Sequence, residues 1–473
     1  MLDQIAILNM SYLIHQAKSA SNSAKQLEFL NKYLIDHMCL FNGKPMPTLL
    51  KPNFVSPKQT QTLIYAVDQI SSALNKFIHL YMSDEVVRRI MKFSDIENEL
   101  FSINPGYNTP LVISRLDAFL NNYSVKFLEF NCDSPAGLAY SDVMEDGFKE
   151  LFKDYPFLSQ WKIDYINRQG LLLKALLTCH NEFRNNSQSF PAKPVIAIVD
   201  WDNVSTFSEF HLLKKYFEQR GYETIVSSPL NFKISGGKAL ADGREVHLVY
   251  KRVITRELLE KWDRVAEFVQ SIKDGLVCCC NSFRSYIVGN KKVLSLITDP
   301  RFQGIFAQNE LNVIKKTIPW TKILADTKVR YKNASFHLKD FIIENKDLLV
   351  LKPANSYGGK NVYLGRETDQ GTWEKIMSEH LYDESWVVQE YVDIPHDIFP
   401  VIKDDISLQL KKVNINPFAL LGKYSGTITR VSDSSVINVS AGGGLVPTLS
   451  AARKKGHHSP TVDGYESSKK LFA

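Results

Sequence analysis

A short apolar strand that ends in polar residues constrains this chain more than any other stretch. Residues Phe127 to Phe130 form the apolar run, and Glu129 and Asn131 are two positions apart, which places them on the same side of a strand. The Ser-Pro-x-Gly sequence that begins at Ser134 predicts a turn directly afterwards. A carboxylate beside a carboxamide suits Mg²⁺, which takes oxygen ligands and shares them with phosphates. A Glu on the exposed face of an edge strand gives the same pattern.

A second strand is predicted just before this one. It runs from Leu111 to Asp117, and the two asparagines at 121 and 122 predict a hairpin turn. If the two strands pair antiparallel, four polar side chains converge on one patch: Arg115, Asp117, Glu129 and Asn131. Oxygen ligands beside a guanidinium are what Mg²⁺ and a transferring phosphoryl group require together. A surface ion pair between Arg115 and a neighbouring carboxylate is the simpler alternative.

Length and composition limit the class of protein. The chain has 473 residues, 44% of them hydrophobic, which predicts two or three lobes. Its 57 basic and 51 acidic residues are interspersed, so we expect no nucleic-acid partner. The run Cys278 to Cys280 is apolar and is interpreted as a buried, reduced strand. No apolar segment has membrane-spanning length and no signal peptide is visible, so we expect a cytoplasmic protein without a membrane partner.

The order of patterns along the chain predicts an α/β protein with additional α+β lobes. Apolar residues at helical spacing between Gln59 and Met82 predict an amphipathic helix that packs on the core. Strands alternate with helices further on, which predicts a doubly wound sheet, but no G-x-G-x-x-G follows its first strand. Asn281 follows the cysteine strand and is a candidate substrate contact. We divide the chain into a helical region (1–95), a segment with the predicted hairpin (96–190), the doubly wound domain (191–310), two further lobes (311–450) and a polar tail (451–473).

A glycine-rich hairpin is predicted around residue 358. An apolar strand carries Lys352, and a second strand begins at Val362. Bare backbone N–H groups of such a loop can lie along phosphates, and the lysine supplies a point charge. The spacing is not that of a Walker loop, and an ordinary glycine hairpin is the alternative. The candidate phosphate contacts are Lys352, Ser356, Tyr357, Gly358, Gly359 and Lys360.

Two later segments complete the set of motifs. Trp386 to Val392 is an apolar strand with a polar end, a composition typical of a hinge that contacts an adenine ring. Its candidate contacts are Gln389, Glu390, Tyr391 and Val392. Consecutive glycines after a strand indicate a close approach to the backbone. Arg430 with Gly442, Gly443 and Gly444 is therefore interpreted as an anion clamp.

Together these motifs resemble those of the ATP-grasp superfamily of carboxylate–amine ligases. The Lys352 strand and its loop look like the family's phosphate-covering loop, and Gln389 to Val392 looks like its adenine hinge. Arg430 followed by Asn438-Val439-Ser440-Ala441-Gly442-Gly443 is similar to the Arg … Asn-x-x-x-Gly-Gly segment of glutathione synthetases.

The position of the last motif implies a circular permutation. In the ordinary family an Asp and a Glu-x-Asn follow the glycine segment, whereas here Asp117 and Glu129-Phe130-Asn131 lie near the front. This order is similar to that of glutathionylspermidine synthetases, in which Arg-x-Asp precedes Glu-x-Asn. The resemblance covers about 111 to 447 and implies a circularly permuted ATP-grasp fold beside a doubly wound pre-ATP-grasp-like α/β domain. It predicts that Glu129 and Asn131 lie beside Lys352 and Arg430.

The resemblance also implies an activity, with ATP and Mg²⁺ as cofactors. It is the ligation of a small-molecule or peptide carboxylate to an amine through an acyl-phosphate. Mg²⁺ would be held by Asp117, Glu129 and Asn131, and Arg115 and Arg430 would act in catalysis. Ser134 would contact substrate, and a further ATP-contacting lysine is expected at Lys315, with Lys316 and Lys322 as alternatives. The competing hypotheses are an inactive nucleotide-binding scaffold and a phosphotransferase that uses the same site.

Overall fold

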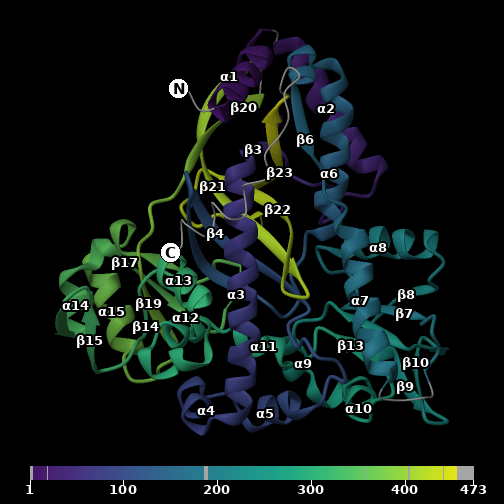
Figure 1. The fold of residues 1–473 in the computed structure, drawn as a ribbon, viewed down its shortest axis with the longest axis vertical. Helices are drawn as coiled ribbons and strands as arrows, with labels where there is room; N and C mark the ends of the chain where they lie inside the picture. Colours follow the sequence, from purple (N-terminus) through teal and green to yellow (C-terminus); the bar gives the residue numbers. More distant parts are fainter. Residues whose placement is uncertain are drawn as a thin grey trace.

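The computed structural model describes residues 4–18, 20–185, 190–356, 358–402, 405–439 and 442–454. Helices surround a large mixed sheet, a parallel sheet and a small antiparallel sheet (Figure 1). The predicted mixed α/β class is therefore confirmed. None of the helices in the described part of the chain combines the length and the apolar character that a membrane span needs.

The large sheet combines strands from distant parts of the chain. Its order is β3-β23-β22-β21-β4-β5, with β20 beside β21 and β6 beside β23. Because β4 pairs antiparallel with β21, the early hairpin joins strands that come near the end of the chain (Figure 1). The strands are β3 (Asn53–Val55), β4 (Ile113–Asn121), β5 (Ser124–Asn131), β6 (Trp161–Asp164), β20 (His396–Ile402), β21 (Ile406–Leu420), β22 (Lys423–Ser432) and β23 (Gly444–Arg453).

The predicted doubly wound region contains a parallel sheet in the order β13-β12-β7-β8. The cysteine strand β13 is fully buried, as expected, and all six cysteines are free. The elements are β7 (Ile196–Val199), β8 (Thr224–Ser227), β12 (Leu248–Lys251) and β13 (Cys278–Cys280), with helices α7 (Arg168–Asn185), α8 (Phe207–Gln219), α9 (Thr255–Glu260) and α10 (Ala266–Lys273) and a separate antiparallel sheet of β9 (Phe232–Ser235), β10 (Lys238–Ala241) and β11 (Arg244–Glu245).

The small sheet is antiparallel, in the order β14-β19-β17-β18. With its helices it forms a lobe at the left of Figure 1. This lobe carries both the Lys352 strand and the predicted hinge. Its elements are β14 (Thr321–Ile323), β15 (Lys328–Tyr331), β16 (Ala334–His337), α14 (Leu338–Glu344), β17 (Leu349–Pro353), β18 (Tyr363–Leu364), α15 (Gln370–His380) and β19 (Trp386–Glu390).

The long helix α3 (Pro57–Ser83) runs across the middle of the molecule (Figure 1). It begins two residues earlier than predicted, because Ser56 and Gln59 form a capping box and Pro57 occupies the first helical position. Its apolar stripe is buried, as predicted. The remaining helices are α1 (Gln4–Ala17), α2 (Ala20–Asp36), α4 (Glu85–Met91), α5 (Asp95–Ser102), α6 (Leu138–Leu151), α11 (Ser285–Gly289), α12 (Lys292–Ile297) and α13 (Gln308–Thr317).

The first 95 residues are not only helical. They contain a two-stranded hairpin, β1 (Leu40–Phe41) with β2 (Lys44–Pro45), and they contribute β3 to the large sheet. Strands this short carry too few residues for a period-two pattern to be visible in the sequence. The predicted helical region is therefore partly integrated into the large sheet.

Candidate active site

The early hairpin forms as predicted and gathers its polar residues. In the register of β4 and β5, Arg115 lies opposite Asn131 and Asp117 lies opposite Glu129. All four line a cavity of about 150 Å³, which we call the small cavity. Its wall also contains Lys352 from β17 and Arg430 from β22. The predicted convergence of Glu129 and Asn131 with Lys352 and Arg430 is confirmed.

Asp117 lies between two arginines. Arg115 Nε donates to one carboxylate oxygen at 3.0 Å, and Arg430 Nη1 donates to the other at 2.7 Å. Burial opposes ionisation of Asp117, but the two guanidinium groups outweigh it and lower the pKa of the carboxyl below its usual value. Asp117 therefore orients Arg115 and Arg430; its predicted metal contact stays a prediction, because a carboxylate oxygen can accept more than one bond.

Glu129 and Asn131 are candidate oxygen ligands that line the small cavity. Glu129 is paired with Lys291 at 3.2 Å and is a quarter exposed. The Nδ2 atom of Asn131 is buried and has no hydrogen-bond partner among the described residues. No cluster of three His, Cys, Asp or Glu side chains suited to a metal occurs within the described ranges. A carboxylate with a carboxamide fits Mg²⁺, which takes its other ligands from water and phosphates.

Lys352 is buried behind the hairpin, as its strand pattern predicts. Its ammonium donates to Leu128 O at 2.9 Å and to Gln389 Oε1 at 2.8 Å. Burial lowers the pKa of Lys352, Glu129 opposes the shift and Lys291 adds to it, and the resulting pKa is about 7. Gln389 is itself held by Thr321, so the lysine is fixed from the hinge strand.

The hinge residues Gln389, Glu390, Tyr391 and Val392 all line the small cavity. Apolar side chains surround them, including Leu128 and Ile394, which gives a slot suited to a flat ring. The N–H groups of Glu390 and Tyr391 already donate to Trp320 O and Leu348 O. These two N–H groups therefore already have acceptors within the small lobe.

The glycine loop lies between the two cavities of the site. Gly358 lines both the small cavity and a larger one of about 540 Å³, and Gly359 lines the small one. Both have positive φ, and a Cβ on Gly359 would meet Val436 at 2.5 Å, so this position requires glycine. Ser356 and Lys360 line the large cavity. The predicted contact Tyr357 lies outside the described residues.

Lys291, which was not predicted as a site residue, lines the large cavity and pairs with Glu129. Its backbone N–H donates to Ala354 O at 2.8 Å and its ammonium donates to Ser356 O at 2.5 Å, so it holds the start of the glycine loop as well as Glu129. The predicted Lys315 is exposed on α13, and none of Lys315, Lys316 and Lys322 lines either cavity. The neighbouring Lys292 binds Ile90 O and Met91 O instead. The local sequence does not show which of these lysines lines the cavity, because tertiary packing determines it.

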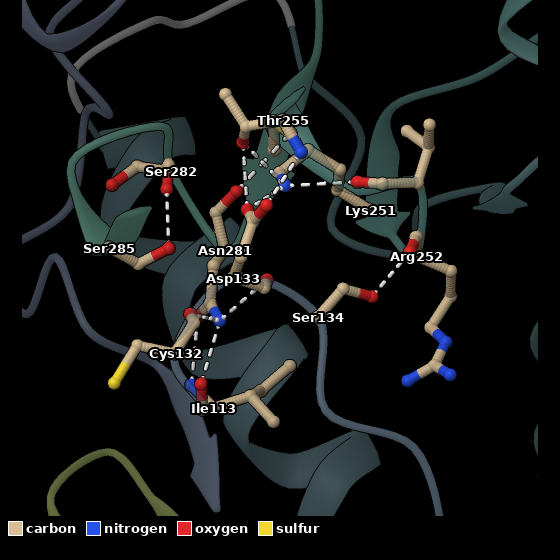
Figure 2. Close-up of polar contacts among 12 residues, drawn as sticks. Ile113, Cys132, Asp133, Ser134, Lys251, Arg252, Thr255, Asn281, Ser282 and Ser285 are labelled. Atoms are coloured by element: carbon tan, nitrogen blue, oxygen red, sulfur yellow. Dashed lines mark hydrogen bonds and ion pairs between the residues drawn. The ribbon is translucent and has the colours of Figure 1, made fainter. Parts of the chain in front are cut away.

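Two of the predicted substrate contacts have structural partners. Asn281 is 1% exposed, and its carboxamide binds the backbone of Ile113 and Cys132 (Figure 2). It also accepts from Val112 N–H. It lines neither cavity, because the end of β13 is covered by the hairpin; the prediction of a substrate contact is therefore corrected. Ser134 does line the large cavity, although its hydroxyl donates to Arg252 O.

The predicted glycine clamp is also corrected. The described glycines 442 to 444 line neither cavity. Gly442 N–H and Gly443 N–H donate to Val439 O and Asn438 O, which closes a turn. A Cβ on Gly443 would lie 2.7 Å from Asn438 O, so the glycine is required by tight backbone packing. Arg430, in contrast, lines both cavities as predicted.

No protein-family model matches the chain, and no curated protein matches it in sequence. Its structure is similar to that of a glutathione synthetase-like effector from Globodera pallida, with a TM-score of 0.63 at 11% identity over 91% of this chain and 97% of the other. The two chains share a fold. A protein from Methylobacillus flagellatus assigned as a gamma-glutamylcysteine synthetase gives a TM-score of 0.41 at 10% identity over 85% of this chain and 89% of the other, which is too distant to inform the fold.

Proposed function

We propose that this chain is an ATP- and Mg²⁺-dependent carboxylate–amine ligase with a circularly permuted ATP-grasp arrangement. One observation carries the proposal. Oxygen ligands from the early hairpin, a buried lysine from the small lobe and an arginine from a late strand meet in one cavity. Removing a charged side chain from water costs free energy, so a sheet gains no stability from placing a lysine and two arginines together. Their convergence therefore supports a binding role.

The small cavity suits the nucleotide. Its apolar slot and hinge residues would flank the base, and Lys352 and Lys291 would meet the phosphates under the glycine loop. Glu129 and Asn131 would hold Mg²⁺. When bound, Mg²⁺ neutralises charge on the β- and γ-phosphates.

The large cavity suits the acid. It shares Arg115 and Arg430 with the small cavity, so a carboxylate bound there faces the end of the phosphate chain. A carboxylate oxygen attacks the γ-phosphorus and ADP leaves with the bridging oxygen. The amine nitrogen then attacks the acyl carbon, phosphate leaves, and the nitrogen gives up a proton. Arg115 and Arg430, oriented by Asp117, stabilise the negative charge in both steps.

The test is an ADP-release screen of amino acids and short peptides against amines, with mass analysis of the product. We expect a condensation product that has lost water and a Glu129→Gln variant that folds but releases no ADP. Glu99→Gln, which alters an exposed ion pair with Lys273, is the matched control and should keep full activity. ATP binding without ADP release from any pool would identify a scaffold, and a phosphorylated product would identify a phosphotransferase; either result contradicts the proposal.

A further inference from the structure

A buried ion pair holds the loop that directly follows the proposed metal ligands. We propose that Asp133 and Lys251 are positioning residues that fix Asn131 and Glu129 relative to the large cavity. This inference rests on the proposed function. It assigns a task to the end of the parallel sheet, which the motifs of the nucleotide site do not explain.

The pair is hydrogen-bonded on several sides, and Asp133 itself lines the large cavity. Lys251 Nζ lies 2.5 Å from Asp133 Oδ1, and the two side chains are 0% and 12% exposed. Thr255 donates to the same carboxylate twice, from its backbone N–H at 2.5 Å and its hydroxyl at 2.8 Å. Figure 2 shows the Asp133 carboxylate between Lys251 and Thr255. A carboxylate with three donors has one orientation, so the loop cannot rotate around it.

The contacts continue along the loop residue by residue. Asn281 donates to Cys132 O at 2.9 Å and to Asp133 O at 3.3 Å (Figure 2). The Ser134 hydroxyl donates to Arg252 O, and Arg252 Nη1 returns a bond to Pro135 O at 2.6 Å. The turn after Asn131 is therefore attached to the ends of β12 and β13.

The attachment joins two walls of the site. On one side, Asn131 and Glu129 line both cavities. On the other side, Ile254 and Arg256 flank Thr255 and line the large cavity. Because Thr255 is bound to Asp133, the distance between the metal ligands and the α9 wall is set by this clamp. Lys352 and the hinge lie on the small lobe; the Lys352 ammonium binds Leu128 O of β5 and Gln389 Oε1, whereas the Asp133 carboxylate binds Lys251 and Thr255. The clamp should therefore affect metal-dependent binding and spare metal-free nucleotide binding.

The experiment compares two double variants by calorimetric titration of ATP with and without Mg²⁺. Asp133→Asn with Lys251→Met removes the clamp's charges together, so that no buried charge is left unpaired. Asp397→Asn with Lys51→Met is the matched control, because Lys51 is also 0% exposed, is paired with Asp397, and both residues lie outside the two cavities. We expect the gain in ATP affinity on adding Mg²⁺ to fall on the order of tenfold in the clamp variant only.

Metal-free ATP affinity should be unchanged in both double variants. Thr255→Val keeps the ion pair but removes the hydroxyl that donates to Asp133 and accepts from Lys251, so it should give a smaller loss of about twofold to threefold. This variant tests the clamp even if the double variant does not fold. Wild-type Mg²⁺ dependence in the folded clamp variant, or equal losses in both double variants, would overturn the clamp alone. If the wild-type protein itself shows no Mg²⁺-dependent ATP binding, the proposed function fails first and the clamp with it.

Discussion

Burial lowers the pKa of Lys352 to about 7, so its charge changes within the neutral pH range. If phosphates bind only to the protonated ammonium, the apparent dissociation constant is divided by the protonated fraction. This fraction falls from about nine-tenths at pH 6 to about one-tenth at pH 8, so metal-free ATP should bind about tenfold more weakly at pH 8.

The terminal phosphate of ATP also titrates near this range, and a Lys352→Arg variant corrects for it. A guanidinium stays protonated throughout, so the ratio of wild-type to variant dissociation constants reports the lysine alone. We expect that ratio to rise about tenfold from pH 6 to pH 8. Calorimetric titration at both pH values measures it. Equal pH slopes in the two proteins would refute the reasoning, as would a ratio that falls with pH.

The same shift has the opposite effect on the unliganded protein. The pKa of Lys352 is about 7 in the folded state, below the ordinary value of 10.5. Between pH 7 and pH 10.5 the unfolded chain therefore binds one proton more than the folded chain. The free energy of unfolding should therefore rise with pH through this window, and Lys352→Met should remove that part of the rise. The increase in melting temperature caused by ATP should consequently be largest at low pH.

Two further substitutions test the structural assignments. Asp117→Asn leaves the guanidinium groups of Arg115 and Arg430 without their shared counter-charge, and we expect it to lower the free energy of unfolding in urea by about 3–5 kcal/mol, whereas Glu223→Gln, in an exposed pair with Arg244, should leave it nearly unchanged. A wild-type urea midpoint for Asp117→Asn would contradict the assignment of this carboxylate to the two arginines. Asn281→Ala leaves buried backbone groups of Val112, Ile113 and Cys132 without partners and should cost about 3 kcal/mol or more in the same assay. A loss below about 1 kcal/mol would restore Asn281 as a candidate substrate contact.

Local patterns predicted the elements of the site well. The alternation of Glu129 and Asn131, the asparagine turn before them and the glycines after Lys352 each specify a backbone conformation within a few residues. The amphipathic stripe of α3 is similarly local. These elements form as predicted because their signals depend on turn chemistry and on periodicity within a single strand or helix.

Tertiary structure decided which charged group faces which. Asp117 forms an ion pair with Arg430, which is 313 positions away in the sequence. No local sequence pattern shows this pairing. Lys291 lines the large cavity, whereas Lys315, at the end of a more regular helix, faces solvent. Asn281 is a packing residue because the hairpin covers the end of its strand. The sequence determined the strands and turns that carry the proposed site; their charged side chains acquire roles only when distant strands pair, since desolvation and partner geometry are set across elements.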